Sequence, residues 1–238
     1  MNDLEDNFIS GIYNYCDRWC ERCSFTSRCR VFAMEQEEVL TDEERDVTNE
    51  AFWKRLAGIF AEAKEKLREK AEELGIDLDA EPEFSEAERR EAIRRQDLVK
   101  LAEKYAHTTS EILENDSFAI SIDDDIRAEL LQIIRWYQFQ IAAKIFRGSD
   151  AELDLADEPE SGLVRDSVIQ DKDGSIKVAL IGIDRSISAW SALLDSDTKD
   201  IVKPMIALLE NIRRETERKF PNARSFVRPG FDEIETVM

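Results

Sequence analysis

The sequence predicts an all-α fold: a four- or five-helix antiparallel bundle with an N-terminal helical four-cysteine module. Glycine and proline are scarce, at 8 and 5 of 238 residues, and 36% of the residues are charged. Apolar residues also recur three and four positions apart over long stretches, which is the period of one helical face. Because 42% of the residues are hydrophobic, these helices can bury a core. Long helices with short connections pack antiparallel.

The first segment, residues 1–40, is the predicted four-cysteine metal- or cluster-binding module. Its apolar residues, beginning with Phe8 and Ile12, recur at helical spacing. This pattern predicts a helix over about residues 4–23. A second short helix is expected over residues 30–37.

Residues 41–220 form the predicted bundle. Its helices are expected over about residues 41–74, 85–115, 122–147, 175–194 and 199–220. Capping residues are expected at the helix ends: Thr41 or Asp42, Gly75, Ser85 with Glu88, Ser121 and Gly148. Pro204 lies near the start of the last helix, and residues 221–238 are predicted to be an irregular tail.

An acidic loop is predicted within the bundle, over residues 149–173. It contains nine acidic residues against Arg165 and Lys172, and loops of this length are usually functional or mobile. The helix that follows has an alternative interpretation, a β-hairpin that turns at residues 171–174, because Val and Ile lie on both flanks. A basic stretch, residues 213–228, is a candidate to dock this loop or a protein partner.

The charge of the chain restricts its partners. The formal net charge is -20 at pH 7, so the surface repels nucleic-acid phosphates and anionic membranes. The N-terminus is acidic rather than a basic and apolar leader, and we find no apolar run of the roughly 18 residues that span a membrane. We therefore expect a cytoplasmic protein that binds neither nucleic acid nor membrane. A protein partner remains open, and so does the oligomeric state.

All four cysteines lie in one segment. They are Cys16, Cys20, Cys23 and Cys29, with the spacing C-x3-C-x2-C-x5-C. On the predicted helix, the first three would share one face. Four thiolates in a reducing compartment are ligands for zinc or for an iron–sulfur cluster, whereas disulfides within so short a helical segment would strain the backbone.

Spacing favours a [4Fe–4S] cluster over zinc as the group that these thiols bind. Residues one helical turn apart have Cβ atoms about 5–6 Å apart, whereas sulfurs around tetrahedral zinc lie roughly 3.8 Å apart. A four-iron cube spreads its thiolates further. Zinc sites also commonly use two C-x2-C pairs, and only Cys20 and Cys23 form one here. Nearby cations would lower thiol pKa values and offset the charge of either centre: Arg18, Arg22, Arg28 and Arg30.

This segment resembles the iron–sulfur loop of endonuclease III-like DNA glycosylases. Cys20-x2-Cys23-x5-Cys29 matches the last three ligands of that family's C-x6-C-x2-C-x5-C pattern. The first gap is three here, the loop is N-terminal, and no helix-hairpin-helix glycine turn is found. The resemblance therefore implies the cofactor and not glycosylase activity. Cys16-x3-Cys20-x2-Cys23 also looks like the radical S-adenosylmethionine signature, but Arg22 stands where that family usually has an aromatic residue, and its barrel strands are not predicted.

The sequence names no reaction. It has no Walker loop, dinucleotide fingerprint or nucleophile elbow, and it has one histidine. The leading hypothesis is an iron–sulfur protein whose cluster is structural or transfers electrons. The alternative is a zinc-stapled acidic interaction scaffold. A third hypothesis is an enzyme with a polar site inside the bundle, near Arg135 and Asp184.

Overall fold

The computed structural model describes residues 7–37, 41–75, 78, 85–114, 125–157 and 162–232. Over these residues, all regular secondary structure is helical, so the predicted all-α class is confirmed. The chain forms two compact units. One unit combines the segment up to Cys29 with the chain from Glu86 onward, and residues 30–85 form the other. The cysteine segment therefore belongs to the same unit as the bundle.

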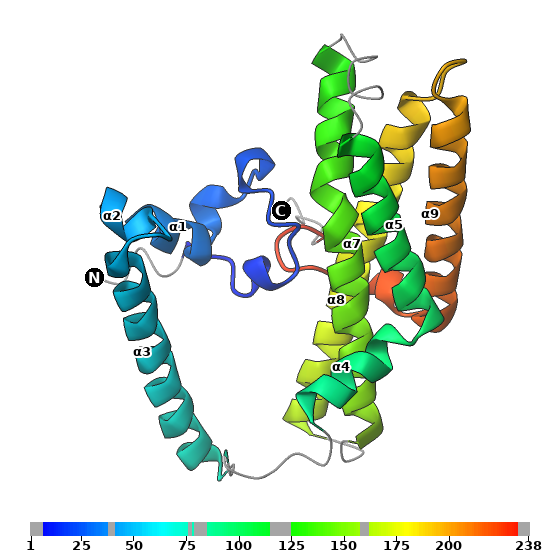
Figure 1. Ribbon diagram of the computed structural model, residues 1–238. Helices are drawn as coiled ribbons and strands as arrows, with labels where there is room; N and C mark the ends of the chain where they lie inside the picture. The colour runs from blue at the N-terminus through cyan, green and yellow to red at the C-terminus, as the bar shows by residue number, and fades with distance from the viewer. Residues whose placement is uncertain are drawn as a thin grey trace, which may run out of the picture. The chain divides into compact units, whose positions relative to one another are not determined.

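Four long helices form the bundle (Figure 1). They are α5 (Asp97–Glu114), α7 (Asp125–Asp157), α8 (Leu163–Ala192) and α9 (Lys199–Lys219). α5 and α8 each pack against α7 and α9, and consecutive helices run in opposite directions. The shorter helix α4 (Glu86–Arg94) packs against α5 and α7. The predicted antiparallel bundle is thus confirmed, although the helix expected over residues 85–115 is divided into α4 and α5.

The bundle interior is apolar. Its buried side chains recur at helical spacing, as in Ile134, Ile141 and Ile145 of α7 and Ile176, Leu180 and Ile183 of α8. The indole N–H of the buried Trp190 donates to the hydroxyl of the buried Tyr105 at 3.1 Å. Arg135 is exposed on α7, so it does not line the interior where a polar site was expected.

Helix α7 continues past Gly148, which was predicted to end it. A Cβ atom at Gly148 would lie 2.4 Å from Cδ1 of Ile176 on α8. The glycine is therefore needed for the close approach of α7 and α8, not for a helix end. The predicted N-cap of this helix, Ser121, lies outside the described residues.

Most of the predicted acidic loop, residues 149–173, is helical, so that prediction was wrong. α7 covers its first part and α8 begins at Leu163. The hairpin alternative at residues 171–174 is also wrong, because these residues lie inside α8. A Cβ atom at Gly174 would lie 2.3 Å from Cδ1 of Tyr15, so this glycine makes room for an aromatic ring rather than forming a turn.

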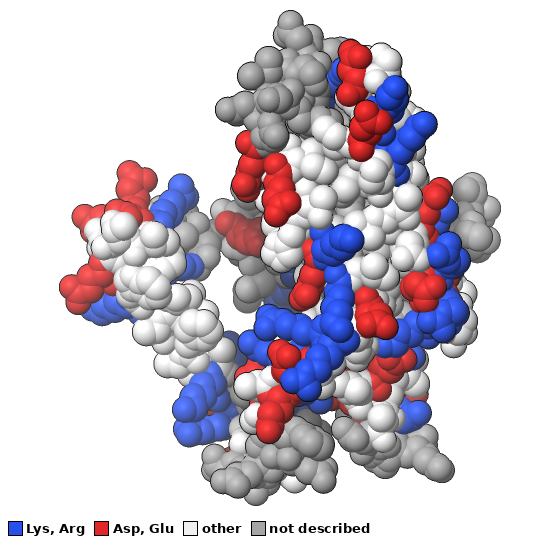
Figure 2. Space-filling model, turned by 45° about the vertical axis from the view of Figure 1, so that its right-hand side comes forward, with Lys and Arg blue, Asp and Glu red and all other residues white. Residues whose placement is uncertain are grey.

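Ion pairs explain how helices accommodate these acids. Arg89 of α4 bonds the carboxylates of Asp150 and Asp154, each at 2.5 Å. Lys219, from the basic stretch near the C-terminus, reaches Glu152 at 2.7 Å. Charges of both signs adjoin one another on the bundle in Figure 2. Asp150, Glu152 and Asp154 are thus paired on a helix face instead of being carried on a loop.

The C-terminal stretch after α9 returns to the cysteine segment. Its short 3-10 helix η4 (Ala223–Ser225) packs against α8. The ring of Phe226 lies edge-on to Tyr15 at 4.8 Å between centroids. Phe231 lies edge-on to Phe25 at 5.0 Å. This part of the predicted irregular tail therefore helps to hold the N-terminal segment.

The second unit consists of short helices and one long helix. These are α1 (Arg30–Glu37), α2 (Asp42–Arg45) and α3 (Glu50–Leu74). The short helix was predicted, but one continuous helix was expected where α2 and α3 are separate. Thr41 and Glu44 form a capping box for α2, and the side chain of Asn49 accepts the N–H of Ala51 to begin α3, so each helix has its own start. Gly75, at a φ of 67°, ends α3 as predicted.

Candidate metal centre

The cysteine segment does not form the helix predicted over residues 4–23. Where the structure describes it, its regular elements are three 3-10 turns: η1 (Ile12–Asn14), η2 (Cys20–Arg22) and η3 (Thr26–Arg28). Gly11 and Arg18 have φ angles of 74° and 58°, in the left-handed region that a right-handed helix excludes. Oδ1 of Asp17 accepts the backbone N–H of Trp19 at 3.2 Å, a local bond that competes with helical ones.

Asp17 anchors this segment to the bundle. Its backbone oxygen accepts from Nε1 of Trp136 at 2.9 Å and from Nε2 of Gln140 at 2.6 Å. Its Oδ2 accepts from the hydroxyl of Tyr137 at 2.6 Å and from Nη1 of Arg185 at 2.7 Å. Burial, reinforced by the Asp17 carboxylate, raises the pKa of Tyr137. The phenol therefore stays protonated and remains the donor.

Aromatic stacking adds a second attachment. The indole of Trp19 stacks on Trp136 with ring centroids 4.9 Å apart. The guanidinium of Arg22 lies 4.2 Å above the Trp19 ring and reaches α7 through Glu129 at 3.1 Å and Gln132 at 3.0 Å. Residues 17–22 are thereby held on the outer face of α7 by stacking, hydrogen bonds and charge.

The four cysteines are half-buried, and none of them is in a disulfide. The backbone N–H of Phe25 donates to Sγ of Cys23 at 3.4 Å. The backbone N–H of Arg18 likewise bonds the sulfur of Cys16. In both cases the donor lies two residues after the cysteine. The thiol of Cys16 also donates to the backbone oxygen of Tyr13 at 3.5 Å.

Charged groups surround the first of these thiols. Burial raises the pKa of Cys16, and Asp17 and Cys29 add to the rise while Arg18 opposes it. The first and last cysteines of the motif are therefore within electrostatic range of each other. Lys144 of α7 interacts with Cys16 as well, and burial is the main cause of its lowered pKa.

The sulfurs are not gathered around one point. Among the described residues, which include all four cysteines, no three His, Cys, Asp or Glu side chains are grouped so that they could hold a metal ion. The expectation that Cys16, Cys20 and Cys23 share one helical face is wrong, because the segment consists of turns. The argument from helical spacing for a cluster over zinc is lost with it.

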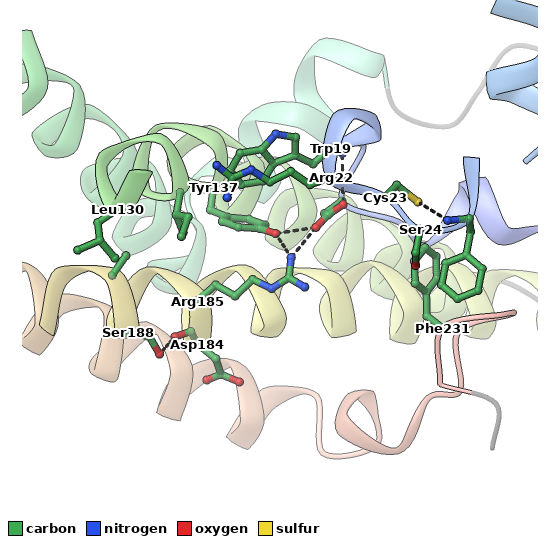
Figure 3. Close-up of a pocket in the computed structure, with 14 residues that line it drawn as sticks. Trp19, Arg22, Cys23, Ser24, Leu130, Tyr137, Asp184, Arg185, Ser188 and Phe231 are labelled. Atoms are coloured by element: carbon green, nitrogen blue, oxygen red, sulfur yellow. Dashed lines mark hydrogen bonds and ion pairs between the residues drawn. The ribbon is translucent and has the colours of Figure 1, made fainter. Parts of the chain in front are cut away.

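A pocket of about 630 Å³ adjoins the cysteine segment. Cys23, Ser24 and Phe25 of the segment line one side of it, and α7 and α8 line the other. Figure 3 shows the hydroxyl of Tyr137 and the guanidinium of Arg185 pointing toward one another in it.

Sequence reasoning found the four cysteines and missed most of what surrounds them. The segment's partners on α7, Trp136 and Tyr137, lie in the helix expected over residues 122–147, where apolar spacing predicts only burial in the core. Gln140 and Lys144 lie on the same helix and had no motif to mark them. Arg185 likewise belongs to no motif in the sequence. The one available signal was that α7 carries apolar and aromatic residues on most sides, which implies contacts beyond a single core face.

Comparison with protein-family models, with curated proteins and with solved structures finds no match to this chain. No helix in the described parts of the chain is long and apolar enough to cross a membrane.

Proposed function

We propose that residues 16–29 bind a metal centre through Cys16, Cys20, Cys23 and Cys29, with a [4Fe–4S] cluster as the first candidate and zinc as the alternative. The observation that carries the proposal is that all four cysteines of the chain lie in one short segment of turns and none of them is in a disulfide. Backbone N–H groups already bond two of the sulfurs.

The donor set fits such a centre in number and chemistry, because four thiolates complete the coordination of zinc or of a four-iron cube. The sulfurs are not grouped in this conformation. Metal binding must therefore draw the turns together, as is usual where a site forms together with its metal. Short 3-10 turns joined by extended residues can rearrange at lower cost than a continuous helix.

The choice between the two metals rests on the number of C-x2-C pairs. The motif has one C-x2-C pair, whereas zinc sites commonly use two. When bound, a cluster supplies one-electron transfer or a structural crosslink, and zinc supplies the crosslink alone. In either case, Asp17 and Trp19 hold the segment on α7, and Lys144 and Arg18 contribute positive charge near Cys16.

Metal and acid-labile sulfide analysis of anaerobically purified full-length protein tests the proposal. We expect iron and sulfide in the [4Fe–4S] ratio and a brown colour, or one zinc per chain and no colour if the alternative holds. Cys29→Ser should lose most of the metal. The matched control is Ser27→Ala, an exposed serine in the same turn, which should retain it.

Protein that stays free of iron and zinc after anaerobic purification, and after reconstitution with iron and sulfide or with zinc, would contradict the proposal. Equal metal content in Cys29→Ser and Ser27→Ala would contradict it as well. Where metal binds, slower amide exchange across residues 16–29 is the expected sign that the turns have closed around it.

A further inference from the structure

The pocket beside the cysteine segment has the size and the lining of a small-molecule site. Its volume of about 630 Å³ lies in the usual range for such sites, which is roughly 300–1,000 Å³. Three parts of the fold line it: the cysteine segment, the outer faces of α7 and α8, and the C-terminal stretch at Phe231. The pocket depends on the attachment of the segment, and Cys23 of the segment is one of its lining residues.

The walls of the pocket are largely aromatic and aliphatic. Trp19, Phe25 and Phe231 supply rings, and Leu130 and Ile133 supply aliphatic carbon from α7. The rings are fixed by contacts of their own: Trp19 stacks on Trp136, and Phe25 packs against Phe231. A planar, apolar body can therefore enter without reorganising the walls.

Arg185 is the polar group with unused donors. Within the described structure, its hydrogen bonds leave from Nη1 only, to Asp17 and Tyr137. In Figure 3 the bonds of Arg185 likewise start from one terminal nitrogen. Its side chain is 54% exposed. The Nε and Nη2 edge can thus receive a carboxylate, whose two oxygens match a guanidinium fork.

The remaining charges limit the ligand to one negative charge. Asp184 is neutralised by Arg213 and Arg224, at 3.4 and 2.6 Å. Arg22 is paired with Glu129, and Asp17 shares Arg185. The pocket therefore has no excess of positive charge that would suit a phosphate dianion, and its specificity comes from the geometry of a single guanidinium.

We propose that this pocket binds a small aromatic monocarboxylate, with the ring between Trp19, Phe25 and Phe231 and the carboxylate on the free edge of Arg185.

Calorimetric titration of the full chain with 2-naphthoate and with its neutral analogue 2-naphthamide tests this inference. We expect one naphthoate site per chain and roughly tenfold or more weaker binding of the amide, because a hydrogen bond to a charged group is replaced by a neutral one. Arg185→Gln should abolish the preference for the carboxylate. Arg135→Gln, an exposed arginine of α7 outside the pocket, is the matched control and should keep it.

A second pair of variants leaves Arg185 and the Asp17 anchor in place. Ser188→Trp fills the pocket from α8 and should prevent binding of both compounds, whereas Ser191→Trp, at an exposed serine of the same helix outside the pocket, should not. Equal affinity for the acid and the amide, an unchanged preference in Arg185→Gln, or no binding to wild type would overturn the inference.

Metal analysis of the same samples separates this inference from the proposed function. A chain that takes up no metal even after reconstitution but binds naphthoate would support the pocket and contradict the metal centre. The titrations use metal-free protein, because metal binding draws together residues 16–29, several of which line the pocket. A chain that takes up metal but does not bind naphthoate in its metal-free form would overturn the pocket alone.

Discussion

Removal of the Asp17 side chain should release the cysteine segment from the bundle. Asp17→Ala deletes the carboxylate that receives the hydroxyl of Tyr137 at 2.6 Å and the guanidinium of Arg185 at 2.7 Å. The backbone oxygen of residue 17 can still accept from Trp136 and Gln140. The variant therefore separates the contribution of the side chain from that of the backbone.

The size of the effect follows from the two lost bonds. The ring of Tyr137 is fully buried and the Asp17 carboxylate is 22% exposed, so the phenol–carboxylate bond contributes about 1.5–3 kcal/mol. Arg185 is half-exposed, so solvent screening limits the ion pair to about 0.5–1 kcal/mol. The attachment should weaken by about 2–4 kcal/mol in total.

Native-state hydrogen exchange measures this loss directly. Because the segment can detach while the bundle stays folded, amide protection within residues 12–29 should fall about 30- to 1,000-fold. The near-ultraviolet circular dichroism of the Trp19–Trp136 stack should weaken as well. Glu21→Ala, at an exposed glutamate of the same segment, is the matched control. Equal protection in Asp17→Ala and Glu21→Ala would refute the assignment of Asp17 as the anchor.

Three further predictions concern the helical framework. Gly148→Ala should destabilise the protein by about 1–2 kcal/mol in urea unfolding, because the added Cβ would overlap Ile176 and this overpacking outweighs the gain in helix propensity. The control Gly58→Ala should not destabilise the protein, because nothing lies within 4 Å of the added Cβ. Equal effects of the two substitutions would contradict the reasoning. Tyr105→Phe should cost about 1 kcal/mol, because it removes the oxygen that accepts from the buried Trp190 indole; an unchanged urea midpoint would show that this bond contributes nothing. Burial raises the pKa of Tyr105 above its ordinary value of 10.0. The stability that the protonated Tyr105 contributes should therefore be complete below pH 10 and decline above it, because the unfolded chain releases the phenolic proton first. In Tyr105→Phe, the free energy of unfolding should fall less steeply at alkaline pH than in wild type, and an identical fall would argue against this linkage.

Local sequence patterns were sufficient to predict the helices that bury one face. α9 was predicted from its periodic apolar residues and ends at Lys219, one residue before the predicted end. The end of α3 at Gly75 followed from the conformational freedom of glycine after a helix. These features depend on residues that are neighbours in the chain, and the printed sequence contains them in full.

Glycines and acids inside α7 and α8 could not be interpreted in the same way. From the sequence, Gly148 indicates the end of a helix and Gly174 indicates a turn. In the structure, Gly148 makes room for the side chain of Ile176, and Gly174 makes room for the ring of Tyr15. Asp150 and Asp154 indicate a loop until Arg89 of α4 is placed beside them. At each of these positions, a contact with a residue distant in the sequence gives a structure other than the one that the local pattern indicates.

The cysteine segment shows the same division. The sequence alone determined that four thiols lie within fourteen positions of one another and that an all-α bundle follows them. Only the tertiary structure decided that the segment is not helical. Its residues Asp17 and Trp19 bond to and stack on α7, and these contacts stabilise the turns more than a short isolated helix would be stabilised by its own hydrogen bonds. The tertiary structure also decided that a pocket lined by Arg185 lies beside Cys23. Spacing along the chain determines which groups can meet, whereas the packing of distant side chains determines which of them do.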